Sequence, residues 1–136
     1  VFRLPAFSTN QRKEVSKMSK ILFWDNGIRN AIIDDLNPLS SRNDQGPLFE
    51  NFMISERLKM NAYFRPTVKS YFWRNYNKSE VDYIETDKTH ISAYEIKWNT
   101  KKKFNVSRAF RHLYPEADMA IIQPNNIVDF TFGNTQ

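Results

Sequence analysis

The chain has 136 residues, of which 40% are hydrophobic and 15% aromatic, enough for one domain with a packed core and too few for two domains of ordinary size. Its formal net charge of +5 favours an acidic partner such as nucleic acid without identifying one. Cysteine is absent and histidine occurs twice, which excludes disulfides and thiolate zinc sites and leaves hard-cation sites built from oxygen ligands.

Three further classes of protein are disfavoured by the sequence. It has no apolar run of membrane-spanning length and no signal peptide, so we expect no membrane association and a cytoplasmic location. With glycine only at Gly27, Gly46 and Gly133, there is no Walker-type phosphate loop and hence no ATP site of that kind in this piece. The chain starts at Val1 rather than methionine, and we expect it to be a fragment of a longer protein.

The N-terminal part predicts extended structure followed by a helix. Residues 1–7, interrupted by Pro5, suit an edge strand, residues 8–20 a loop or short helix, and residues 20–24 a short strand. Asp25 or Asn26 can then cap a helix. Its apolar residues recur at helical spacing, up to Asn37 and Pro38: Ile28, Ala31, Ile32 and Leu36.

A second helix is predicted from Gly46, with Pro47 at the favoured first position. Its buried stripe is expected to contain Leu48, Phe49, Phe52, Met53, Ile54 and Met60. Glu50 lies one turn from the N-terminus of this helix. Its carboxylate either interacts with the helix dipole or points across to the acidic residues of the strands described next.

Residues 67–74 predict a strand that leads into a hairpin over residues 80–98. If Asp87 and Lys88 are the two loop residues, Thr86 pairs with Thr89 and Asp82 lies opposite Ala93. In that register Asp82 shares one face with Glu95 and Lys97. The other face is apolar and requires a covering helix: Val81, Tyr83, Tyr94, Ile96 and Trp98.

After the hairpin, Asn105 or Ser107 can cap a third helix that ends before Pro115. Its inward side chains are expected to be Val106, Ala109, Phe110 and Leu113. Residues 119–122 are continuously apolar and predict a central strand parallel to residues 94–98. Residues 127–130 suggest one more short strand.

The predicted order is helix, strand, strand, strand, helix, strand, which gives an α/β (α+β) fold with a mixed central sheet and helices on both faces. Two acids and a lysine at one end of a buried strand pair are costly to desolvate unless they are paired or hold a cation. Asp82, Glu95 and Lys97 are therefore the first candidates for a functional site.

Five segments carry a resemblance to a known family: residues 23–30 (FWDNGIRN), 46–51 (GPLFEN), 71–74 (YFWR), 80–84 (EVDYI) and 95–97 (EIK). With them the chain resembles the uncharacterised C-terminal domain of bacterial and archaeal AAA-type ATPases, and more broadly the PD-(D/E)XK nuclease-like superfamily. The resemblance implies a restriction-endonuclease-like core over residues 20–136. It also implies that residues 1–19 are an arm connecting to an ATPase region that is missing here.

The same resemblance implies roles for individual residues. Asp82 and Glu95 would bind Mg²⁺ or Mn²⁺, with Glu50 as an accessory acid, and Lys97 would orient or polarise the attacking water. Two carboxylates supply the hard oxygens that such an ion prefers. The superfamily pattern has proline before the aspartate, where this chain has Val81.

Each of these groups also has a purely structural interpretation. The acids and Lys97 also fit a structural ion-pair cluster, which Arg74 on the neighbouring strand could neutralise without a metal. The positive residues are candidates for contact with DNA or RNA, but they also fit a solvated surface: Lys101, Lys102, Lys103, Arg108, Arg111 and Arg74.

Two functions follow as hypotheses. The first is a divalent-metal-dependent, nuclease-like domain of a larger ATPase that hydrolyses phosphodiesters or binds nucleic acid. The second is a catalytically silent interaction or regulatory module of that ATPase.

Overall fold

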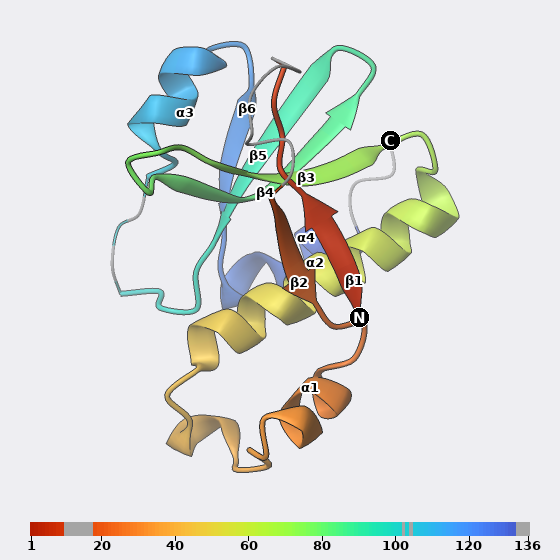
Figure 1. The fold of residues 1–136 in the computed structure, drawn as a ribbon, viewed down its shortest axis with the longest axis vertical. Coiled ribbons are helices and arrows are strands. Elements are labelled where there is room, and N and C mark those ends of the chain that lie inside the picture. The colour runs from red at the N-terminus through yellow and green to blue at the C-terminus, as the bar shows by residue number, and fades with distance from the viewer. Residues whose placement is uncertain (10–17, 102, 104, 133–136) are drawn as a thin grey trace.

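The computed structural model describes residues 1–9, 18–101, 103 and 105–132 (Figure 1). In chain order the elements are β1 (Phe2–Pro5), β2 (Ser19–Leu22), α1 (Asn26–Ile32), α2 (Gln45–Phe64), β3 (Lys69–Arg74), β4 (Glu80–Asp87), β5 (His90–Ile96), α3 (Arg108–Leu113), β6 (Asp118–Ile122) and α4 (Ile127–Phe132). From α2 to β6 the predicted order of helix, three strands, helix and strand is confirmed.

The central sheet has the strand order β3-β4-β5-β6. β3, β4 and β5 form an antiparallel meander, and β6 runs parallel to β5, as predicted. The prediction that β6 is a central strand is wrong, because it lies at the edge of the sheet. The fold is therefore α+β with a mixed sheet. β1 and β2 form a separate two-stranded sheet, which is joined to β3 by a bridge between Ala6 and Phe72.

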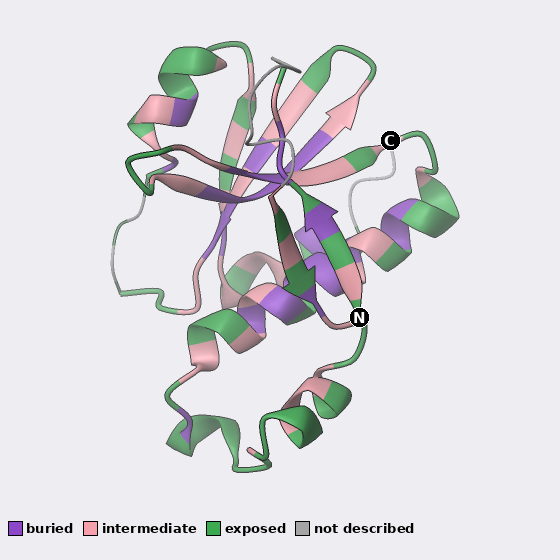
Figure 2. Ribbon diagram, in the orientation of Figure 1, coloured by how far each residue is buried: buried purple, intermediate pink, exposed green. Residues whose placement is uncertain are grey.

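Helices cover both faces of the central sheet (Figure 2). On one face, α2 and α4 enclose a core that includes Phe49, Met53, Ile54, Tyr83, Ile96 and Phe130. On the other, α3 packs through Val106 and Phe110 against Trp73, Val81, Ile84 and Ala93. The apolar face predicted for the hairpin is thus divided, because Val81 lies on the α3 side and Tyr83 on the α2 side.

A β-bulge in β4 explains this division. Tyr71 pairs with Ile84 and Trp73 with Val81, so that the single residue between them on β3 faces both Asp82 and Tyr83. An extra residue of this kind shifts the in-and-out alternation of a strand by one position. As a result Val81 and Ile84 share one face although they are three residues apart.

The hairpin register differs from the predicted one by two residues. Asp87 pairs with His90, and Ile84, not Asp82, lies opposite Ala93. The loop residues are therefore Lys88 and Thr89, and Lys88 takes the left-handed conformation with φ 56°. A shift of two residues preserves the faces, because side chains alternate with a period of two.

The predicted strand over residues 127–130 is wrong, because Ile127–Phe132 forms helix α4. A short 3₁₀ turn, Pro124–Asn126, precedes it and carries reciprocal hydrogen bonds between Gln123 and Asn126. This capped turn directs the chain into helical conformation. Phe130 then enters the α2-side core.

Two helical positions predicted to face inward are exposed. Leu113, the last residue of α3, is 59% exposed, and Phe52 of α2 is 41% exposed. The predicted caps of the short helices are confirmed, with Asp25 accepting a hydrogen bond from the Ile28 N–H at 3.0 Å and Ser107 from the Phe110 N–H at 3.4 Å.

Helix α1 contains no buried residue and lies at one end of the molecule, beyond the start of α2 (Figure 1). It ends at Ile32, short of the predicted Asn37 and Pro38. Ile28, Ile32 and Leu36 are all more than half exposed. In the described part of the chain, no helix combines the length and hydrophobicity needed to cross a bilayer.

A buried polar network joins α2 to β4. The Arg57 guanidinium donates to both Glu85 carboxylate oxygens at 2.6 and 2.9 Å and to the Phe130 carbonyl at 2.5 Å. Asn61 and the Tyr83 hydroxyl donate to Glu85 Oε1 at 2.7 and 3.1 Å. The charges are thus paired and hydrogen-bonded, which is the condition for burying them at tolerable cost.

Candidate metal site

The acidic residues meet at the end of the sheet where β4 and β5 separate. The last pair of the β4–β5 ladder at this end is Tyr83 with Tyr94. Beyond this pair, Asp82 is the next residue on β4 and Glu95 the next on β5, and both are buried. The bulge places Asp82 at the point where the strand alternation changes, so that its carboxylate can contact groups from both α2 and β5.

The two oxygens of Asp82 face different partners. Oδ2 accepts a hydrogen bond from the Ile96 N–H at 2.8 Å and lies 3.7 Å from the Lys97 Nζ. Lys97 is also 3.3 Å from Glu95 Oε2. The structure therefore brings together Asp82, Glu95 and Lys97. The other Asp82 oxygen, Oδ1, points toward the β2 side, 4.0 Å from the Lys20 Nζ.

One carboxylate oxygen from each of Glu50, Glu80 and Asp82 lies within 4.8 Å of the other two. We call these three the acid triad. Glu50 was expected from its place on the second helix, whereas Glu80 was not singled out. It stands two residues before Asp82, and period-two alternation was a signal that could have found it. Glu95 lies beside Asp82 but is not a member of the triad.

A lysine that sequence reasoning missed lies among the triad. Lys20 of β2 donates to Glu50 Oε1 at 2.7 Å and also pairs with Glu80. Its side chain is 15% exposed. No local pattern links residue 20 to residues 50 and 80, because the contact depends on how the β1–β2 sheet packs against the central one.

Arg74 does not neutralise Asp82. Its guanidinium forms hydrogen bonds with Glu80 Oε2 at 2.9 and 2.7 Å and lies over the ring of Phe72. Positive charge beside Asp82 comes instead from Lys97 and Lys20. Arg74 contributes only through Glu80.

Burial and crowding change the proton affinity of two acids. Burial, followed by the charge of Asp82, raises the pKa of Glu95 to about 8. Burial and the charge of Asp82 also raise the pKa of Glu50, although Lys20 acts against this. Both carboxyls therefore hold protons more tightly than usual, as expected when several acids share a site with too little positive charge.

Glu80 and Lys97 are stabilised in their ionised forms. Burial acts to raise the pKa of Glu80, but hydrogen bonds from Lys20 and Arg74 outweigh it and lower that pKa. Burial opposes the charge of Lys97, yet Asp82 and Glu95 raise its pKa. The site thus contains fixed cations and acids of unequal strength.

The predicted nucleic-acid contacts are divided between two faces. Lys101 and Lys103 are exposed in the connection between β5 and α3, and Lys102 lies outside the described residues. Arg108 and Arg111 are exposed on α3, which covers the face of the sheet opposite α2.

Residues 45–134 match a family model described as a domain of unknown function, DUF4143. The chain belongs to this family. The match covers more than half of the chain and contains Glu50, Glu80, Asp82 and Glu95, whereas Lys20 precedes it. DUF4143 domains are associated with the C-terminal regions of AAA-type ATPases. No curated protein and no solved structure matches the chain.

Proposed function

We propose that this DUF4143 domain is a divalent-metal-dependent, nuclease-like module of a larger ATPase, and that it binds nucleic acid and hydrolyses its phosphodiester bonds. The observation that carries the proposal is the meeting of four carboxylates and Lys97 at one end of the sheet. The element order and the positions of Asp82, Glu95 and Lys97 also fit the resemblance to the PD-(D/E)XK superfamily, and membership of that superfamily is part of the proposal.

The donor set suits a hard cation. The triad of Glu50, Glu80 and Asp82 offers only carboxylate oxygens, the ligands that Mg²⁺ and Mn²⁺ prefer. Asp82 is shared between the triad and Glu95, so a metal held by Asp82 would recruit its further ligands from either side. When bound, such an ion polarises a phosphodiester and lowers the pKa of a water molecule.

Lys97 and Glu95 would support that chemistry from β5. The Lys97 ammonium lies close to both acids, where it can orient a water molecule or stabilise developing negative charge. Glu95 is mostly protonated near neutral pH, since its pKa is about 8. Metal binding would favour its ionised form.

Calorimetric titration with Mn²⁺ and a cleavage assay on DNA and RNA test this proposal. Asp82→Asn should abolish both metal binding and cleavage, and Glu50→Gln should weaken metal binding. Asp129→Asn, at an exposed position of α4, is the matched control and should behave as the native protein. Metal-dependent cleavage that persists unchanged in Asp82→Asn would show that the site is wrong.

The second candidate function is a catalytically silent interaction module, and the position of Lys20 favours it. An ammonium group already pairs with Glu50 and Glu80, so the charge of the triad is partly compensated without a metal. The exposed Ile28, Ile32 and Leu36 near α1 would then serve association. This candidate predicts no Mn²⁺ binding, together with self-association that Ile28→Glu and Ile32→Glu weaken in analytical ultracentrifugation.

A further inference from the structure

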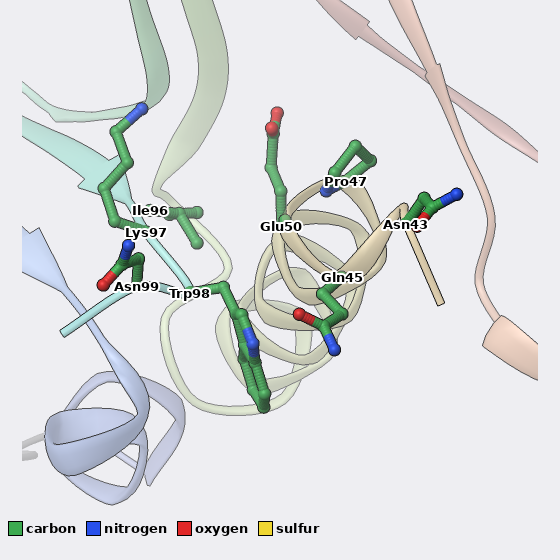
Figure 3. A pocket seen from close by; sticks show the side chains of 9 residues that line it. Asn43, Gln45, Pro47, Glu50, Ile96, Lys97, Trp98 and Asn99 are labelled. Atoms are coloured by element: carbon green, nitrogen blue, oxygen red, sulfur yellow. The ribbon is translucent and has the colours of Figure 1, made fainter. Parts of the chain in front are cut away.

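A groove leads away from the acidic residues between the first turn of α2 and the end of β5. Its first part is a cavity of about 390 Å³ (Figure 3). Side chains that line it include Asn43, Gln45, Glu50, Lys97, Trp98 and Asn99. A second cavity of about 570 Å³ shares Gln45, Trp98 and Asn99 with the first and extends to Lys101 and Pro124. The two cavities therefore adjoin along a shared wall, and together they are called the groove, which extends from beside Glu50 to the basic connection.

Trp98 is the aromatic wall of this groove. Its ring packs edge-on against Phe49, with centroids 5.4 Å apart and planes at 63°, so the indole is held in place from the core side. It remains only half-buried and also borders a third, apolar cavity of about 210 Å³. In Figure 3, Glu50 and Lys97 project toward one end of the first cavity and the Trp98 indole toward the other, with Gln45 beside it. An anchored, accessible indole offers a rigid surface for stacking.

We propose that this groove binds an unpaired nucleotide of single-stranded nucleic acid, with the base stacked on Trp98 and the neighbouring phosphates near Lys97 and Lys101. The inference rests on the proposed function and adds the substrate class to it. The two lysines stand at opposite ends of the groove and Trp98 between them. Alternation of positive charge with an aromatic platform is how proteins bind single strands without reading a fixed sequence.

A duplex fits this arrangement less well. In a duplex the faces of the bases are covered by their stacked neighbours, so only an unpaired base can lie on the indole. The amide side chains of Asn43, Gln45 and Asn99 line the groove and suit the polar edges of such a base. Glu50 also lines it, but its carboxylate is paired with Lys20 at 2.7 Å, which reduces its repulsion of a phosphate.

Fluorescence anisotropy with labelled oligonucleotides in EDTA tests the inference on the whole chain. Single-stranded DNA or RNA should bind more tightly than a duplex of the same sequence, and the two single strands distinguish the source of the nucleotide. Trp98→Leu keeps apolar volume but removes the stacking surface and should weaken binding about tenfold to a hundredfold, whereas Trp98→Phe should lose less. Trp24→Leu, at an exposed tryptophan packed on Phe2, is the matched control and should bind normally.

A second measurement keeps Trp98 in place and therefore tests the inference even if Trp98→Leu fails to fold. In Trp24→Phe the remaining tryptophans are buried Trp73 and half-buried Trp98, so a bound strand should quench the emission and shield it from acrylamide. Equal affinity for duplex, full binding by Trp98→Leu, unchanged emission, or no binding of either strand would each overturn the inference.

The metal-free conditions separate this inference from the proposed function. Trp98→Leu should bind Mn²⁺ normally, because Trp98 supplies no oxygen ligand, and Asp82→Asn should still bind single strands in EDTA. Failure of Mn²⁺ binding with intact strand binding refutes the metal site alone. Failure of strand binding with intact Mn²⁺ binding refutes the groove alone.

Discussion

Glu95 carries the clearest signature of crowded negative charge, because burial and Asp82 raise its pKa to about 8. The folded protein therefore binds a proton at Glu95 that the unfolded chain releases near pH 4.5. Between pH 5 and 8 the unfolded state holds fewer protons at this residue, so the free energy of unfolding should fall as the pH rises. Urea denaturation should show a loss on the order of 2–4 kcal/mol over this range. Glu50 acts in the same direction.

Glu95→Gln removes this titration and should flatten the pH dependence, with higher stability than the native protein at pH 8. Glu116→Gln, at an exposed site, should leave the slope unchanged. A native protein whose stability rises steadily from pH 5 to 8 would contradict the account. The lowered pKa values of Glu80 and Glu85 act mainly below this range.

Lys20 supplies positive charge to the triad, and its replacement by methionine should have two opposite effects. Without metal, Glu50 and Glu80 lose their shared partner, and the free energy of unfolding should fall by about 1–3 kcal/mol. Affinity for Mn²⁺ should rise at least about tenfold, because the ammonium no longer repels the ion.

Calorimetry and denaturation with and without Mn²⁺ measure both effects. Lys59→Met, at an exposed lysine paired with Glu56, is the matched control. If Lys20→Met binds Mn²⁺ no better than the native protein, Lys20 and the ion do not share the site.

The charged site residues that the sequence could identify are those placed by local periodicity. The alternation of side chains in the hairpin identifies Asp82, Glu95 and Lys97, and the position of Glu50 near the start of the second helix identifies Glu50. The hairpin register was wrong by two residues, but such an error does not change the face. Lys20 could not be identified, because its contacts span residues 20 to 80 and depend on the packing of two sheets.

At the scale of elements, α2 is attached to the sheet by a buried ion pair as well as by apolar contacts. Among the described residues, Arg57→Met would leave the buried Glu85 carboxylate with Asn61, Tyr83 and partly exposed Arg65 as its partners. Loss of one member of a buried pair costs about 3–5 kcal/mol. Chemical denaturation should show a destabilisation of this order. Glu56→Gln, on the exposed side of the same helix, should change stability by less than about 0.5 kcal/mol.

The elements that sequence predicted correctly have strong local signals. Pro47 and an apolar stripe define α2, and the run of residues 119–122 defines β6 as a strand parallel to β5. The central position predicted for this strand is wrong, because β6 lies at the edge of the sheet and Ile122 is its one buried residue. Ile127–Phe132 was mistaken for a strand because its apolar residues are too few to show a period, and the capped turn before it decides the outcome. The burial of Arg57 and Asn61 within an otherwise apolar helix face could not be inferred without knowing that Glu85 lies opposite.

At the scale of the whole molecule, positive side chains lie on two layers, and only one layer adjoins the groove. Lys101 lines the groove, whereas Arg111 is on α3 over the opposite face of the sheet. Lys101→Gln should reduce the slope of log affinity against log salt by about 1, as expected for the loss of one phosphate contact. Arg111→Gln should leave the slope unchanged in the same anisotropy titration. Equal effects of the two changes would place the strand across both layers.

Because of the bulge in β4, deletion of the single residue Asp82 would remove part of the candidate site and leave the packing of the sheet unchanged. Without Asp82, Val81 would still face α3 and Tyr83 would still face α2, now as neighbours in ordinary alternation. A one-residue deletion here would therefore remove the shared carboxylate while leaving both cores in phase, whereas most deletions within a central strand reverse every side chain beyond them. In this chain, loss of the carboxylate that the triad shares with Glu95 and retention of the domain are thus one mutational step apart.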